Sequence, residues 1–179
     1  MKRDNARRLI FGIALCATLI LLQGCVVPVP IPVSVSWIES VKLHNNPNAK
    51  DVPWSELKAF LANDKTDEQQ YSSTFVCADF ALTLHESAEN AGIKAAVVAV
   101  EFENDSTGHA LDAFRTTDKG LVYIDDTRPR SFPCSADTTV SLEVGKEYSS
   151  QLVFPCPGYS STMSLSGNLG NVKDIKIRW

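Results

Sequence analysis

The chain has 179 residues, 44% of them hydrophobic, and a formal net charge of −4. Four of its 17 basic and one of its 21 acidic side chains lie in residues 1–24, which leaves 13 against 20 and a charge of −7 for the remainder. This acidic balance argues against nucleic acid as a partner and against a polybasic membrane-binding face. The roughly 155 residues that follow are enough for one ordinary domain.

Residues 1–24 have the layout of a secretory signal peptide. A basic stretch, Met1 to Arg8, precedes an apolar run, Leu9 to Leu22, which is short for a membrane span of ~20 residues. The run ends in Leu-Gln-Gly-Cys, and this resembles a bacterial lipoprotein cleavage site. The resemblance implies that Cys25 becomes a lipid-modified N-terminus, which would hold the protein on the extracytoplasmic face of a cell membrane. The alternatives are an uncleaved anchor and an ordinary signal peptide.

Residues 25–50 are expected to form a tether and a lead-in to a domain over residues 51–179. Val26 to Val35 reads VVPVPIPVSV, and its three alternating prolines favour a stiff, extended spacer. The same apolar residues would equally suit an edge strand that packs on the core. Asn45 to Asn48 marks a loop.

A helix is predicted over residues 51–61. Asp51 is placed to cap it, and Pro53 lies near its first turn. The apolar residues recur at helical spacing and predict a buried stripe, which makes this helix a scaffold element. The stripe consists of Trp54, Leu57, Phe60 and Leu61.

The middle of the chain carries the candidate chemistry. From Cys77 the apolar positions repeat with a helical period, which predicts a helix that begins at the cysteine and stops at Gly92. Residues 93–102 read as a buried strand, and residues 109–114 and 121–124 read as a hairpin. A cysteine at a helix start is a candidate nucleophile, because the helix dipole and a nearby imidazolium both favour the thiolate.

Among the three histidines, His109 is the one placed to reach Cys77. His85 lies eight residues along the same helix, about 12 Å from the sulfur at ~1.5 Å per residue. His44 lies in the polar lead-in. His109 is therefore the candidate base.

Two neighbouring carboxylates compete to complete a thiol–imidazole–carboxylate triad. A hairpin that pairs residue 115 with residue 121 puts Asp125 on the same face as His109. A register shifted by one residue would put Asp126 there instead.

This part of the chain resembles the transglutaminase-like cysteine enzymes, a branch of the papain-like fold, over roughly residues 54–127. The matching segments are Cys-Ala-Asp-Phe-Ala at 77–81, Ala-Gly-Ile-Lys-Ala at 91–95, Gly-His-Ala at 108–110 and Tyr-Ile-Asp-Asp-Thr at 123–127. The resemblance implies an α+β fold with a papain/transglutaminase-like core, in which the nucleophile helix packs on an antiparallel sheet. The Asp-x-Thr of the family pattern favours Asp125 over Asp126.

The resemblance also implies a role for each site residue. Cys77 would be the nucleophile, His109 the general base and Asp125 the group that orients the imidazole. The backbone N–H of Cys77, with Gln70 or Tyr71 as a second donor, would stabilise the oxyanion.

The function expected from this resemblance is an envelope-anchored cysteine hydrolase or acyltransferase that acts on peptide or amide bonds, with cell-wall peptide among its candidate substrates. Water as acyl acceptor would make it a peptidase or amidase, and an amine would make it a transglutaminase. No cofactor is expected. The alternative is a non-catalytic surface module that keeps the fold for binding.

The C-terminal part is predicted to be strands with one disulfide. Residues 138–144 and 148–154 read as a hairpin, and residues 172–179 as a closing strand. Cys134 and Cys156 flank the hairpin, and outside the cytoplasm they are expected to pair, which would add ~3 kcal/mol. The alternative is two free buried cysteines. No close Cys/His cluster has zinc-site spacing, so no metal is expected.

Overall fold

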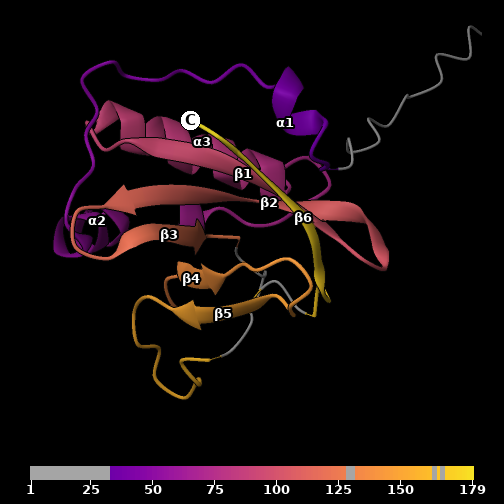
Figure 1. Ribbon diagram of the computed structural model, residues 1–179. Helices are drawn as coiled ribbons and strands as arrows, with labels where there is room; N and C mark the ends of the chain where they lie inside the picture. The colour runs from indigo at the N-terminus through magenta and orange to yellow at the C-terminus, as the bar shows by residue number, and fades with distance from the viewer. Residues whose placement is uncertain (1–32, 128–131, 163–164, 166–167) are drawn as a thin grey trace, which may run out of the picture.

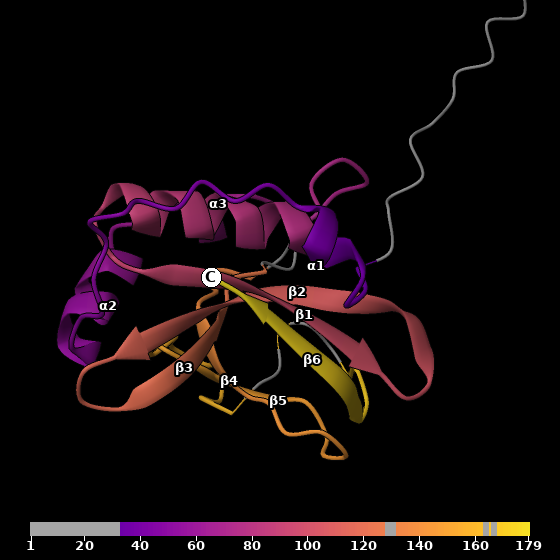
Figure 2. The same ribbon diagram turned by 45° about the horizontal axis from the view of Figure 1, so that its top comes forward.

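A long helix, α3, lies across one face of a six-stranded antiparallel sheet (Figures 1 and 2). The computed structural model describes residues 33–127, 132–162, 165 and 168–179. The sheet has the strand order β5-β4-β3-β2-β1-β6. The strands are β1 (Ala95–Phe102), β2 (Asp105–Thr116), β3 (Gly120–Asp125), β4 (Thr138–Ser141), β5 (Ser149–Leu152) and β6 (Val172–Arg178); the helices are α1 (Trp37–Ser40), α2 (Trp54–Leu61), the short 3-10 helix η1 (Thr66–Glu68) and α3 (Cys77–Asn90).

The predicted α+β class, with the cysteine helix packed on an antiparallel sheet, is therefore confirmed. The expected strand over residues 93–102 is β1, and the expected hairpin is β2 and β3. The two C-terminal strands of the expected hairpin are shorter than the sequence pattern, and the closing strand is β6.

The predicted helix over residues 51–61 forms as α2, but its cap differs from the prediction. Pro53 is the N-cap residue and makes no side-chain capping hydrogen bond. Asp51 lies two residues before it, outside the helix. The Trp54 N–H instead donates to the Asp118 carboxylate at 2.7 Å, from the turn between β2 and β3. A residue 64 positions away supplies the acceptor that sequence reasoning assigned to a neighbour.

The sheet is buried on both faces, and the two faces have different partners. Toward α3, Phe114 and Ile124 pack with Leu84 of the helix. On the opposite face, Val98 and Leu111 are directly paired across β1 and β2 and belong to a second apolar cluster. This explains why β1 reads as an unbroken apolar run rather than as an alternating one.

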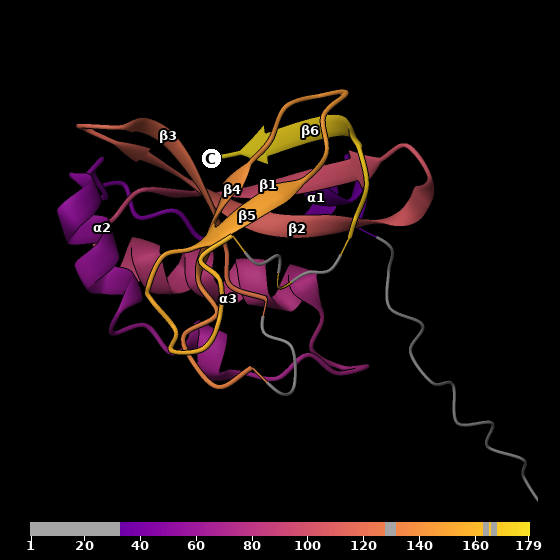
Figure 3. The ribbon, with the colours of Figure 1, turned by 90° about the horizontal axis from the view of Figure 1, so that it is seen from below.

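The second face is enclosed because the sheet curls on itself. The connection between β4 and β5 bonds to the chain entering β6: the Val172 N–H donates to the Lys146 carbonyl at 2.8 Å, and the Tyr148 N–H donates to the Gly170 carbonyl at 3.0 Å. Figure 3 shows this connection beside β6. Because β5 and β6 lie at opposite ends of the strand order, these bonds give the sheet the form of an open barrel.

The described part of the expected tether packs on the core. Val33 is 3% exposed, and its carbonyl oxygen would lie 2.2 Å from a Cβ placed on Gly108, which has φ +62°. At residue 33 the chain is thus part of the domain, as in the edge-packing alternative. The signal segment, the lipidation candidate Cys25 and residues 26–32 lie outside the described residues. Among the described helices, none is both long enough and apolar enough to cross a membrane.

The expected disulfide is present. Cys134 and Cys156 are bonded, with their Cα atoms 5.8 Å apart, which confirms the predicted pairing. The bond ties the segment before β4 to the segment after β5. Cys77 is the free cysteine of the described residues.

Candidate active site

Cys77 is the first residue of α3. The preceding residue, Val76, is extended, with φ −110° and ψ 178°, and its N–H donates to the Asp79 carboxylate of the first helical turn at 2.8 Å. This fixes where the helix begins. The Cys77 side chain therefore lies at the positive end of a helix of 14 residues, where a thiolate is favoured. Cys77 is 7% exposed.

His109 and Asp125 meet in the interior of the curled sheet. Arg115 pairs with Leu121 in the β2–β3 hairpin, which is the register that puts both residues on one face. His109 Nε2 lies 2.8 Å from Asp125 Oδ2, and both side chains are almost fully buried. The backbone N–H of Thr127 donates to the other carboxylate oxygen, Oδ1, at 3.0 Å.

The imidazole of His109 also contacts Cys77. Burial lowers the pKa of His109, but the charge and hydrogen bond of Asp125, together with a hydrogen bond and charge interaction with Cys77, raise it to about 10. Because Nε2 is bonded to Asp125, Nδ1 is the ring nitrogen left for the thiol. Thiol, imidazole and carboxylate are thus contiguous in that order.

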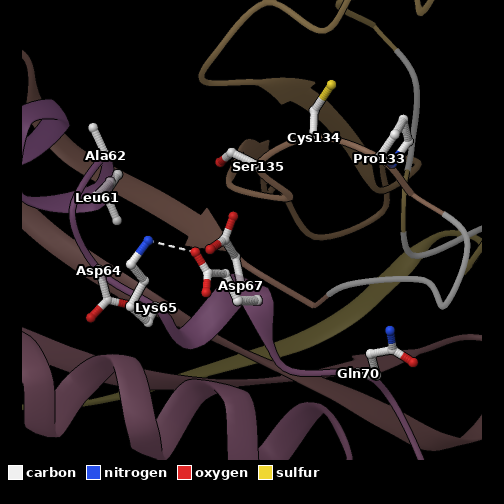
Figure 4. A pocket seen from close by; sticks show the side chains of 10 residues that line it. Leu61, Ala62, Asp64, Lys65, Asp67, Gln70, Pro133, Cys134 and Ser135 are labelled. Carbon is white, nitrogen blue, oxygen red and sulfur yellow. Dashed lines mark hydrogen bonds and ion pairs between the residues drawn. The ribbon is translucent and has the colours of Figure 1, made fainter.

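Of the two expected oxyanion donors, Tyr71 is the one that reaches Cys77. Burial is the main cause that raises the pKa of Tyr71; the charge of Cys77 acts in the same direction, and a hydrogen bond from the Cys77 backbone acts against it. The Tyr71 hydroxyl therefore lies at the amide of the candidate nucleophile. Gln70 lines a separate cavity of about 510 Å³, next to η1 and the Cys134 disulfide (Figure 4).

Asp126, the competing carboxylate, does not bond to the imidazole. It follows the last residue of β3 and is 1% exposed. Burial, then the charges of Asp137 and Asp125, raise its pKa well above the ordinary value. Its Oδ2 has no hydrogen-bond partner within the described chain. The geometry thus separates the two candidates, with Asp125 as the partner of His109.

Sequence reasoning missed the residue that completes this cluster, Tyr148. Its hydroxyl donates to Asp125 Oδ2 at 2.6 Å, and its ring meets the His109 ring edge-on at 5.9 Å between centroids. The residue is the first of the expected strand over residues 148–154, and no local pattern indicates a contact 23 positions back along the chain. Asp112 was also missed, although an acidic residue inside the apolar run of β2 was a visible signal.

Within the described ranges, no group of three or more His, Cys, Asp or Glu side chains is arranged to hold a metal ion. Comparison with protein families, with curated proteins and with solved structures gives no match for this chain. The chemistry of the site is therefore inferred from its own geometry.

Proposed function

We propose that the protein is a transglutaminase-like cysteine hydrolase or acyltransferase that acts on peptide or amide bonds through Cys77, His109 and Asp125. The observation that carries this proposal is the buried bond of 2.8 Å between His109 Nε2 and Asp125 Oδ2, made by an imidazole that also contacts Cys77. Nucleophile, base and orienting carboxylate need this contiguity. The arrangement of α3 on the antiparallel sheet is compatible with a papain-like core.

The reaction begins with the thiol proton on His109. The Cys77 sulfur attacks the carbonyl carbon of the amide, forming a C–S bond and a tetrahedral oxyanion. When the oxyanion collapses, the C–N bond breaks, His109 gives its proton to the leaving amine, and a thioester remains. Water or a second amine then attacks the thioester after giving a proton to His109, and the sulfur leaves.

The oxyanion would be stabilised by two donors that meet at the start of α3. The first is the Cys77 backbone N–H, which has no acceptor inside the helix because it belongs to the first turn; it donates to the Tyr71 hydroxyl, which a substrate oxyanion would replace as acceptor. The second is the Tyr71 hydroxyl, which already lies against this amide. Tyr71 is 40% exposed, so the donor borders solvent, from which a substrate would approach.

We also propose that the enzyme works outside the cytoplasm, anchored to a membrane through Cys25. The Cys134–Cys156 disulfide supports an oxidising compartment. Metabolic labelling with a radioactive fatty acid would test the anchor. Label should appear in the protein and disappear in Cys25→Ala, whereas label retained in that variant would reject the assignment.

Alkylation of Cys77 tests the proposed function. Iodoacetamide should modify Cys77 faster than free cysteine at pH 7, because only the thiolate reacts and the imidazolium and helix terminus stabilise it. His109→Ala should slow alkylation, while His44→Ala, an exposed histidine in the lead-in, should not. A wild-type rate no faster than that of free cysteine would reject the enzymatic proposal.

The second candidate, a non-catalytic binding module, is favoured by the burial of Cys77, which is 7% exposed. A module that keeps the triad without using it should hold Cys77 inaccessible. In that case alkylation would become fast only under denaturing conditions, and the His109→Ala substitution would leave the native rate unchanged.

A further inference from the structure

One oxygen of the Asp125 carboxylate, Oδ2, is shared by two hydrogen-bonding groups. His109 Nε2 lies 2.8 Å from Oδ2, and the Tyr148 hydroxyl donates to the same atom at 2.6 Å. The other oxygen, Oδ1, accepts from the Thr127 N–H at 3.0 Å. The imidazole and the tyrosine hydroxyl therefore share the acceptor capacity of a single carboxylate oxygen.

Tyr148 is held in this position by its surroundings. It is 4% exposed, and its N–H donates to the Gly170 carbonyl at 3.0 Å, which ties the residue to the chain before β6. Its ring packs edge-on against His109 and Phe102, each at 5.9 Å between centroids. The hydroxyl thus reaches Asp125 from an ordered site that also covers the imidazole.

A hydroxyl donor on a carboxylate oxygen has a defined electrostatic effect. It stabilises the ionised form of the acid and withdraws negative charge density from the oxygen that attracts the imidazolium. Tyr148 should therefore keep Asp125 ionised and reduce its attraction for the proton on His109. Since His109 must return that proton to the leaving amine, a weaker hold favours collapse of the tetrahedral oxyanion to the thioester.

We propose that Tyr148 is a positioning residue that shares Oδ2 of Asp125 with His109 and so weakens the hold of the carboxylate on the imidazolium proton. The role of Tyr148 in turnover rests on the proposed function. The electrostatic part needs no substrate, so it can be tested independently of turnover.

The test is a pH titration of His109 by ¹⁵N NMR in histidine-labelled protein. Tyr148→Phe keeps the ring and removes only the hydroxyl, so the pKa of His109 should rise above that of the wild type. Tyr123→Phe is the matched control, because it removes a hydroxyl from a half-buried tyrosine two residues before Asp125 on β3. The control should leave the pKa of His109 unchanged.

The sign of the shift separates this role from a merely structural one. A hydroxyl that only braces the fold would, when removed, loosen the His109–Asp125 bond, and the pKa of His109 would fall toward its ordinary value. An unchanged or lowered pKa in Tyr148→Phe would overturn the proposal, as would an equal rise in Tyr123→Phe. An unreactive Cys77 would reject the proposed function and leave the titration result intact.

Discussion

Asp126 directly follows Asp125 along the chain, and the two carboxylates face opposite sides of the sheet. Asp125 bonds to His109 and Tyr148 inside the curled sheet, whereas Asp126 lies on the side of α3 with the charges of Asp137 and Asp64. Alternation of side chains along a strand produces this separation. One strand end therefore supplies both the carboxylate of the candidate triad and a buried acid that the triad does not use.

Asp112 lies on the same side of the sheet as Asp126, and its substitution should stabilise the protein at alkaline pH. Both Asp112 oxygens lack hydrogen-bond partners within the described residues, and burial, then Asp126, raises its pKa well above the ordinary value. For an acid whose folded pKa is raised, stability is full below the unfolded pKa and is lost as pH rises through the folded one. Asp112→Asn should therefore raise the free energy of unfolding by about 1–2 kcal/mol at pH 8 and hardly change it at pH 4.

Urea unfolding at the two pH values measures this effect. Asp174→Asn, an exposed acid on β6, is the control for loss of one negative charge. An Asp112→Asn protein that is no more stable than Asp174→Asn at pH 8 would show that the folded state does not raise the pKa of Asp112.

The contact between Val33 and Gly108 can be tested by adding one methyl group. A Cβ at Gly108 would lie 2.2 Å from the Val33 carbonyl oxygen and 2.8 Å from that of Val100, both backbone atoms that cannot move aside alone. Gly108→Ala should cost about 3 kcal/mol of unfolding free energy. Gly120→Ala is the matched control, since Gly120 also has positive φ, +75°, but has nothing within 4 Å, and should cost only about 1 kcal/mol.

Thermal unfolding compares the two glycine variants directly. If both lose the same stability, the chain at residue 33 does not pack against β2, and the segment before α1 would be better described as a free tether. A clear difference supports the packed lead-in.

The two aspartates considered as caps for α2 make another matched pair. The Asp118 carboxylate accepts a hydrogen bond from the Trp54 N–H at 2.7 Å. Asp51 lies two residues before the N-cap residue, Pro53, and is outside the helix. Asp118→Ala should cost about 1 kcal/mol, the usual value for losing a cap, and Asp51→Ala should cost little. If chemical denaturation showed a larger loss of stability for Asp51→Ala than for Asp118→Ala, Asp51 would be the cap, as predicted from the sequence.

The sequence was most informative where a local pattern decides the structure. The apolar period from Cys77 predicts α3, and the hairpin register that puts His109 and Asp125 on one face is the observed one. What the pattern could not provide depends on residues distant in the chain. The Asp118 cap reaches α2 from the turn between β2 and β3, and the Tyr148 hydroxyl reaches Asp125 from the connection between β4 and β5.

The paired aspartates at the end of β3 give a test of the His109 ion pair. Asp125 raises the pKa of His109 to about 10 against the effect of burial. For a base whose folded pKa is raised, the stabilisation is full below the unfolded pKa of 6.5 and is lost as pH rises through about 10. Asp125→Asn should therefore cost about 3 kcal/mol at pH 7, because it leaves a buried imidazole without its counter-charge.

The measurement is the free energy of unfolding from pH 6 to 10.5 in wild type, Asp125→Asn and Asp126→Asn. The difference between wild type and Asp125→Asn should shrink as pH approaches and passes 10, where the wild-type imidazole also becomes neutral. Asp126→Asn should keep the decline due to His109, because the carboxylate bonded to the imidazole is that of Asp125. If Asp126→Asn, and not Asp125→Asn, removed that decline, the carboxylate of the triad would have to be reassigned, because the bond at 2.8 Å would not be the interaction that holds the proton on His109.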